Sequence, residues 1–245
     1  MLNSRSAFLA VQAKWCTRNR MNVLALATAI LLAVTAPAPA PSTDVARDAV
    51  LCSDLEAALD RRFDACNGVI AATTLSTDIR FEAYLRRAAI YFMEKGDFDH
   101  AIADASEAIK LKPDDARGHA ARGGFEAAYN QFDKAIADLS EAIRLEPAFV
   151  GGFAQRAYAY AQTGETDKAI ADYTEVLRLQ PGDANAHYDR GGAYEKKGDF
   201  DKARADFEQA IRLQRDYAGE FPDTCFGTTD KGERGLKNWP ACDEN

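Results

Sequence analysis

A pattern of small apolar positions returns along the chain every 34 residues. In each copy an alanine, any one residue, a second alanine and an aspartate follow one another. The four copies lie at 101–104, 135–138, 169–172 and 203–206. A fixed period of this length is typical of repeat arrays, in which each unit buries its apolar face against its neighbours. The pattern therefore predicts an all-α array of similar units.

Each unit is predicted to form two helices. In the last full unit we expect a first helix over Ala184–Lys197 and a second over 201–214. Gly198 separates them, because glycine adopts the positive φ that ends a helix. Small residues of the skeleton, such as Gly191 and Ala203, mark the places where the two helices must approach closely.

The same skeleton recurs in the preceding units. It reads His119-x-x-Arg122-Gly123, Phe153-x-x-Arg156-Ala157-x-x-Tyr160 and His187-x-x-Arg190-Gly191-x-x-Tyr194. Proline follows three of the second helices, at Pro113, Pro147 and Pro181. Proline stops a helix, so these positions are expected to close their units.

This skeleton resembles the tetratricopeptide repeat, a helix–turn–helix unit of the same length. The resemblance covers 81–215 as four units and implies an α-solenoid whose first helices line a concave binding face. The first unit holds one extra residue before Gly96, and the second has Glu126 where the family has tyrosine. Asn130 replaces the loop glycine there, and asparagine also tolerates positive φ.

Arginine replaces the leucine that the family usually has before the small residue of the first helix. The arginines and the aspartates of the repeated motif therefore form two series with the same spacing. We predict ion pairs between adjacent helices, such as Asp138 with Arg156 or with Arg122, which would fix the register of the array. The alternative is a ladder of charges that binds a ligand.

The array is flanked by two shorter segments. Residues 43–80 are expected to be a degenerate capping helix pair, with helices within 48–71 and a turn near 59–61. The tail, 216–245, contains four glycines and two prolines and is predicted to be mostly irregular. It either folds back over the open end of the last helix pair or is disordered.

Residues 1–42 have the order of a secretory signal. An apolar run at 23–34 follows Lys14, Arg18 and Arg20 and precedes small residues. The run is too short for a transmembrane helix, so we expect export to the periplasm or secretion. Cleavage is expected after Ser42, with an uncleaved anchor as the alternative, and translation from Met21 would keep the apolar run.

The cysteine count is compatible with an oxidising compartment. Cys16 lies in the leader, which leaves Cys52, Cys66, Cys225 and Cys242 as two on each side of the repeats. Four cysteines allow three pairings, and proximity along the chain favours Cys52–Cys66 and Cys225–Cys242. A zinc site and four free thiols in a cytosolic protein are the alternatives.

Charge and motifs argue against several function classes. The chain of 245 residues has a formal net charge of −8, which disfavours nucleic acid as a partner. The sequence shows no metalloprotease HExxH motif, phosphate-binding loop or nucleophile elbow. His119 and His187 occupy equivalent repeat positions where packing is the simpler explanation. We therefore expect no catalysis, no cofactor and no metal.

Partner choice is expected at positions that differ between units. By resemblance to the family, the binding face includes Arg117, Tyr158, Asn185, Tyr188 and Glu195. The lysines and asparagines of the family's carboxylate-clamp subgroup are not matched there. The predicted function is a non-catalytic scaffold for a protein or peptide. A self-associating structural protein and a thiol-dependent enzyme are the alternatives, although the absence of Cys-x-x-Cys argues against the enzyme.

Overall fold

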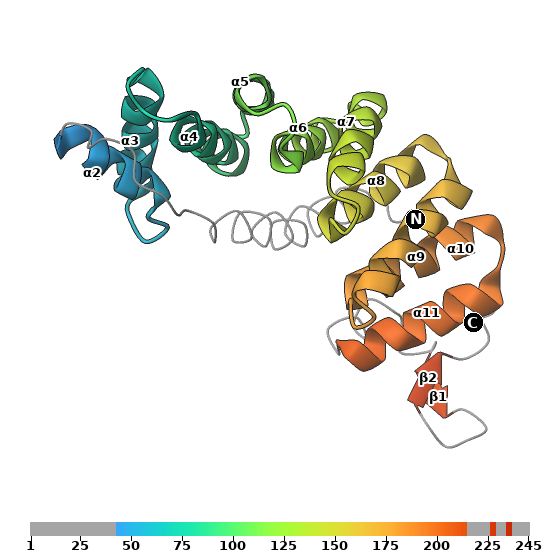
Figure 1. Ribbon diagram of the computed structural model, residues 1–245. Helices are drawn as coiled ribbons and strands as arrows, with labels where there is room; N and C mark the ends of the chain where they lie inside the picture. Colours follow the sequence, from blue (N-terminus) through green and yellow to red (C-terminus); the bar gives the residue numbers. More distant parts are fainter. Residues whose placement is uncertain (1–42, 215–225, 229–233, 237–245) are drawn as a thin grey trace, which may run out of the picture. The chain divides into compact units, whose positions relative to one another are not determined.

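The computed structural model describes residues 43–214, 226–228 and 234–236 as parts of two compact units that divide between Tyr129 and Asn130. The N-terminal unit contains α2 (Thr43–Ser53), α3 (Leu59–Ala71), α4 (Thr77–Ile90), η1 (Tyr91–Lys95), α5 (Phe98–Leu111) and α6 (Ala116–Ala128) (Figure 1). The C-terminal unit contains α7 (Phe132–Leu145), α8 (Val150–Thr163), α9 (Thr166–Leu179), α10 (Ala184–Lys197), α11 (Phe200–Leu213), β1 (Phe226–Thr228) and β2 (Arg234–Leu236).

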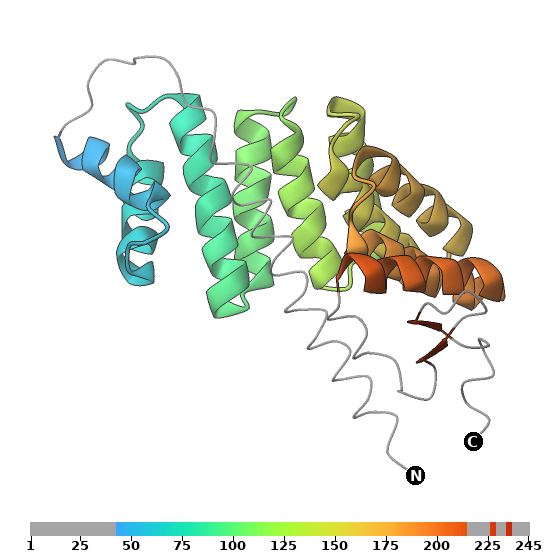
Figure 2. The ribbon, with the colours of Figure 1, turned by 90° about the horizontal axis from the view of Figure 1, so that it is seen from below.

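Within each unit, every helix packs against the next helix along the chain (Figure 2). The all-α repeat fold of the α-solenoid class is thereby confirmed, with α10 bounded as the sequence predicts. In the predicted tail, β1 and β2 form a short antiparallel pair, which irregular sequence did not indicate. The leader 1–42, the rest of the tail and the pair Cys225–Cys242 lie outside the described residues.

The turns between paired helices follow the predicted chemistry. Gly164 and Gly198 adopt positive φ values of 84° and 81° and end the first helices α8 and α10. Asn130 adopts a φ of 61° between α6 and α7, as expected for the residue that replaces the loop glycine. Left-handed backbone therefore separates the paired helices whether glycine or asparagine supplies it.

The extra residue of the first unit is accommodated inside the helix and does not lengthen the loop. α4 continues directly into η1, one π-helical turn from Tyr91 to Lys95, before Gly96 ends it with a φ of 61°. A π-turn holds one more residue than an α-helical turn, which absorbs an insertion while the later loop geometry is kept. The turn also brings Tyr91 into edge contact with Phe63 of α3, with ring centroids 5.2 Å apart.

The two alanines of the repeated motif have different surroundings. The first alanine of every copy is 0% exposed, at positions Ala101, Ala135, Ala169 and Ala203. The second alanine of every copy is exposed, so the expectation that both alanines mark helix contacts is wrong for the second. The fully buried Ala108, Ala142, Val176 and Ala210 each lie seven residues after a first alanine, which places both on one helix face.

The segment before the repeats forms the expected helix pair, α2 and α3. The turn between them spans 54–58, a few residues earlier than predicted. The structure joins Cys52 of α2 to Cys66 of α3, with their Cα atoms 4.9 Å apart. Both cysteines lie in a buried cluster with Val69 and Leu75, so the junction is part of the core of this pair.

Adjacent glycines in α10 give a matched test of close helix packing. A Cβ atom on Gly191 would lie 2.8 Å from Phe207 Cε1 and 3.2 Å from the Ala203 carbonyl oxygen of α11, whereas one on Gly192 meets nothing within 4 Å. Gly191→Ala is expected to lower the free energy of unfolding by about 1–2 kcal/mol. Gly192→Ala should raise it by about 0.5–1 kcal/mol through helix propensity.

Urea unfolding followed by circular dichroism measures both changes in one assay. Because the two substitutions are chemically identical and adjacent, propensity contributes equally to both. Shifts of the same sign and size at the two positions would contradict the close approach of α10 and α11 at Gly191.

Candidate partner-binding surfaces

A repeated arginine–aspartate pair joins the two helices of a unit. Arg156 donates from Nε and Nη2 to the two carboxylate oxygens of Asp172, at 2.7 and 2.9 Å. Arg190 binds Asp206 in the same way at 2.7 and 2.8 Å, and Arg87 binds Asp104 at 2.8 and 2.7 Å. These three aspartates are each 6% exposed. The hydrogen bond to Asp172 raises the pKa of Arg156.

The remaining guanidinium nitrogen, Nη1, binds the preceding second helix. It donates to Ser140 from Arg156, to Thr174 from Arg190 and to Ser106 from Arg122, over 3.0–3.2 Å. Arg156 and Arg190 therefore each tie three consecutive helices together. The hydroxyl series has the same 34-residue spacing in the sequence, a signal that would have revealed this contact.

These contacts favour the structural reading of the two charged series. Ion pairs between adjacent helices are present as expected, but one suggested pair is wrong. Arg156 binds Asp172 of its own helix pair and does not bind Asp138. Since the arginines and their aspartates are largely buried between helices, they hold neighbouring helices in register. A ladder exposed to a ligand does not match this arrangement.

His187 takes part in the same device. Its Nδ1 lies 2.9 Å from Oδ1 of Asp206, the carboxylate that also accepts both bonds from Arg190. His119, at the equivalent position, has Nε2 3.0 Å from the carbonyl oxygen of Pro113. Both histidines are therefore engaged by the scaffold, in agreement with the packing explanation of their repeat position.

Arg117, a predicted partner-binding residue, lies at the start of α6 in the N-terminal unit. It donates to both carboxylate oxygens of Asp115, at 2.9 and 2.8 Å, and also to Glu82 of α4. Its guanidinium carbon lies 4.9 Å from the centre of the Phe81 ring. The hydrogen bonds to Asp115 raise the pKa of Arg117 despite partial burial. Arg117 is thus strongly held in place.

Tyr158 lies on α8 in the C-terminal unit and is half-buried. Its ring meets that of Phe132 edge to face, with centroids 6.1 Å apart. Burial raises the pKa of Tyr158 to about 12, and the charge of Asp189 on α10 adds to the effect. Asp189 was not among the predicted site residues, because only the structure shows that α8 and α10 bring the two side chains together.

The other predicted residues of this unit lie on α10. Tyr188 is half-buried against α11, with its ring centroid 5.4 Å from that of Phe207, and packs with Ala184 and Ala210. Its ring therefore also belongs to the core of the last helix pair. Asn185 is half-buried, and Glu195 is exposed near the end of the helix.

Titration of the Tyr158 phenol is expected to report its burial and the nearby charge of Asp189. The phenol stabilises the folded chain below its unfolded pKa of about 10, and that contribution is lost as the pH rises through about 12. A pH jump with phenolate absorbance as the readout should show a late ionisation step that Tyr158→Phe removes. Asp189→Asn should move the step to lower pH, and Tyr160→Phe should leave it in place. A late step that persists in Tyr158→Phe would contradict the assignment.

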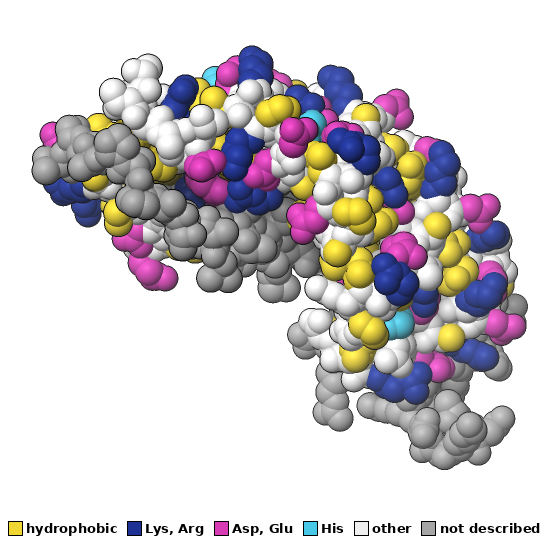
Figure 3. Space-filling view, viewed as in Figure 1, with side chains coloured by type: hydrophobic (Ala, Val, Ile, Leu, Met, Phe, Trp, Pro, Cys, Tyr) yellow, Lys and Arg dark blue, Asp and Glu magenta, His cyan; other side chains and the backbone are white. Residues whose placement is uncertain are grey.

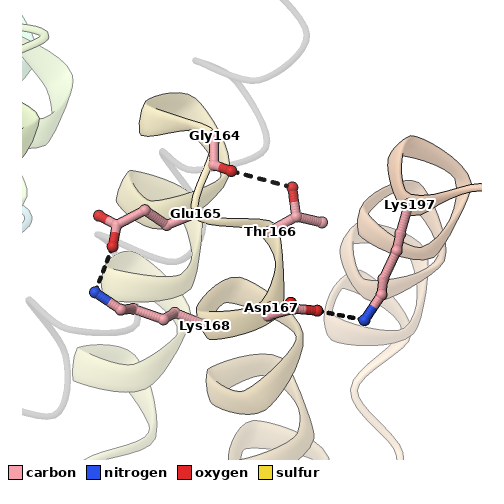
Figure 4. Close-up of a pocket in the computed structure, with 6 residues that line it drawn as sticks. All are labelled: Gly164, Glu165, Thr166, Asp167, Lys168 and Lys197. Carbon is pink, nitrogen blue, oxygen red and sulfur yellow. Dashed lines mark hydrogen bonds and ion pairs between the residues drawn. The ribbon is translucent and has the colours of Figure 1, made fainter.

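A shallow cavity of about 370 Å³ lies beside the turn between α8 and α9 (Figure 4). Its lining residues are Gly164, Glu165, Thr166, Asp167, Lys168 and Lys197. Glu165 pairs with Lys168, and Asp167 pairs with Lys197, as the dashed lines show. The charged side chains that line the cavity are thus paired with one another.

The wider surface carries mixed charge. In the view of Figure 3, acidic and basic side chains are interspersed over both units. Across the part of the chain that the structure describes, no group of three or more His, Cys, Asp or Glu side chains is placed to hold a metal ion. The helices within that part also lack the length and apolar character needed to cross a membrane.

Known proteins give an independent view of the repeats. A family model of the tetratricopeptide repeat matches residues 86–148 and 155–218, more than half of the chain. The chain belongs to the tetratricopeptide repeat (TPR) family. The matched residues cover most of the range 81–215 that the 34-residue period predicts as TPR units. Comparison with curated proteins yields no match.

Solved structures of other TPR proteins share the fold. A crystal structure of MamA is 25% identical over 66% of this chain and 91% of its own, with a TM-score of 0.58. MamA from residue 41 to its end, from Desulfovibrio magneticus RS-1, is 16% identical over 72% and 98%, with a TM-score of 0.64. YrrB, described as a TPR protein with an unusual peptide-binding site, is 21% identical over 73% and 91%, with a TM-score of 0.59.

Proposed function

We propose that this TPR protein is a non-catalytic scaffold that binds a protein or peptide partner outside the cytoplasm. The observation that supports this proposal is that repeated and varying positions of the first helices have different surroundings. The arginines at the repeated positions of α8 and α10 form ion pairs within the scaffold, such as Arg156–Asp172. Neighbouring positions that differ between units carry Tyr158 and Asp189, which remain half-buried on the surface.

That surface suits a partner chain better than a small substrate. A half-buried tyrosine supplies contact area and a polar tip, which is a common anchor in protein interfaces. His119 and His187 are engaged by the scaffold, and the cavity beside α9 has internally paired charges. These features give little basis for acid–base or nucleophilic catalysis, so binding is the function that the geometry supports best.

Two features support action outside the cytoplasm. The apolar run at 23–34 follows basic residues in the order of an export signal. Cys52 and Cys66 lie together in the core of the capping pair, with their Cα atoms 4.9 Å apart. Oxidising compartments are where such pairs normally form disulfides. Fractionation of cells that make the full chain should find it outside the cytoplasm, and deletion of 23–34 should retain it inside.

Affinity purification with the full chain as bait tests the binding function. A recovered partner should be lost with Tyr158→Ala and kept with Glu175→Ala, which changes a residue of the second helix α9 whose side chain is 40% exposed. A partner that binds both variants equally would rule out the Tyr158 surface. If the recovered protein is a second copy of the chain, the self-associating alternative holds, and light scattering would then show a multimer.

A further inference from the structure

Three arginines from different helices lie near one another within the N-terminal unit. Arg62 lies on α3, Arg86 on α4 and Arg117 on α6. They are near enough that the positive charges of Arg62 and Arg117 both act on Arg86. We call these three residues the arginine cluster. Its members come from the capping pair and from two successive first helices, so the fold itself assembles it.

Acidic partners compensate only part of this cluster. Arg117 is bound by Asp115 and Glu82, as described above. Among the described residues, none forms an ion pair or a side-chain hydrogen bond with the guanidinium group of Arg86 or Arg62. The Nε atoms of both side chains are buried and unpartnered within that same part of the chain. Both side chains remain half-buried overall, so solvent still reaches part of each guanidinium.

The arrangement is costly for the free protein. Burial lowers the pKa of Arg86, Glu82 offsets this in part, and Arg62 and Arg117 lower it further. A buried donor without a partner costs free energy, and like charges at close range add to that cost. An anion that contacts the exposed part of the guanidinium groups of Arg62 and Arg86 would relieve the repulsion between their charges.

The cluster is separate from the repeat scaffold. Arg86 precedes the scaffold arginine Arg87, and the corresponding residues of the later units are Ala121, Gln155 and Asp189. Since the array folds with uncharged or acidic residues at that position, Arg86 is not needed to pair the helices. Arg62 lies before the repeats altogether. The two arginines without an ion pair, Arg62 and Arg86, therefore do not belong to the repeated pairing of the helices.

We propose that the arginine cluster binds a carboxylate group of an acidic peptide segment in a partner protein. This proposal rests on the peptide-binding function proposed above. A guanidinium presents two parallel donors that match a carboxylate, and such charge-assisted bonds are strong when partly shielded from water. Glu82 and Asp115 leave only a small local excess of positive charge, in a chain of net charge −8. That balance suits one or two carboxylates better than a polyphosphate or a nucleic acid.

Fluorescence anisotropy with the full chain tests this directly. The probe is a fluorescein-labelled dodecapeptide of alternating glutamate and serine, compared with its glutamine counterpart at low ionic strength. The glutamate peptide should bind more tightly. Arg86→Gln and Arg62→Gln should each weaken its binding about tenfold, as expected for the loss of a charge-assisted hydrogen bond. Arg61→Gln, which removes the same charge from the exposed neighbour on α3, should leave the affinity within about twofold.

Further variants separate charge from geometry and folding. Arg86→Lys keeps the charge but loses the fork, so it should bind between the wild type and Arg86→Gln. The melting temperature of Arg86→Gln should not fall, because the substitution removes an unpartnered donor. If Arg86→Gln fails to fold, Arg62→Gln gives the same comparison from another helix.

Three outcomes would overturn the proposal. One is equal affinity for the glutamate and glutamine peptides, including no binding of either at millimolar protein. A second is an equal loss of binding in Arg61→Gln. The third is displacement of the peptide by inorganic pyrophosphate at lower concentration than by succinate, which would indicate a phosphate site. A partner captured through Tyr158 that still binds Arg86→Gln would leave the scaffold function standing and remove only this site.

Discussion

Arg156→Met is expected to lower the free energy of unfolding by about 3 kcal/mol, a large effect for one partly exposed side chain. The substitution keeps the aliphatic bulk but leaves the Asp172 carboxylate, which is 6% exposed, without its two guanidinium donors. It also removes the bond from Nη1 to Ser140 on the preceding second helix. Urea unfolding followed by circular dichroism is the measurement.

A matched control is available in the C-terminal unit, on α7. Arg144 donates to both oxygens of Glu141 at 2.8 and 2.7 Å, but its side chain is 65% exposed. Arg144→Met should therefore change stability by less than about 0.5 kcal/mol. Equal losses in Arg156→Met and Arg144→Met would show that burial of the repeated pair has no special role.

A second variant separates the cost of an orphaned charge from the value of the pair. Arg156→Met combined with Asp172→Leu removes both charges and should recover most of the loss, because apolar residues of similar volume often replace buried ion pairs at little cost. Such recovery would show that the repeated pairs specify the register of the helices and add little net stability. A double variant as unstable as Arg156→Met would instead make the pair a net stabilising element.

The repeat architecture was predictable because its signals are local. The prolines at Pro113 and Pro147 and the turn residues Asn130 and Gly198 each act within a few residues of their position, and the 34-residue period repeats these signals along the chain. Helix ends at Leu111 and Leu145, two residues before those prolines, follow from the same local sterics. An array of similar units then repeats one correct local solution.

Pairing across helices was less predictable, because a period alone leaves it ambiguous. Asp138 lies 16 residues after Arg122 and 18 residues before Arg156, so the spacing permits either neighbour. The hairpin geometry of a helix pair resolves the ambiguity: the observed arginines reach aspartates 16 or 17 residues later, as with Arg156 and Asp172. The structure of the insertion before Gly96 was equally ambiguous, because the same sequence could form a longer loop or a π-turn.

The candidate surfaces were the least predictable part. Tyr158 was identified from its variation between units, but its neighbour Asp189 comes from another helix. The arginine cluster needs three helices to form, and Arg86 lies next to a scaffold arginine that has an ordinary repeat role. Proximity of this kind depends on packing, which no spacing along the chain records.

Loss of the Cys52–Cys66 bond is expected to destabilise the capping pair by about 3 kcal/mol, the entropy of closing a loop of this length. The two cysteines are 14 residues apart in sequence, and their side chains lie in a core shared with Val69 and Leu75. That core is small, so α2 and α3 have little other burial to hold them together. The double variant Cys52→Ala with Cys66→Ala is the direct test.

The location of the effect is as informative as its size. Units of a repeat array contact mainly their neighbours, so hydrogen exchange should accelerate in α2 and α3 and remain unchanged in α10 and α11. Alkylation of the denatured chain without reductant, followed by peptide mapping, should leave Cys52 and Cys66 unmodified when the protein is isolated from outside the cytoplasm. Full modification of both would contradict the proposed compartment. Equal exchange in the oxidised chain and the double variant would instead show that packing around Val69 holds the capping pair without the bond.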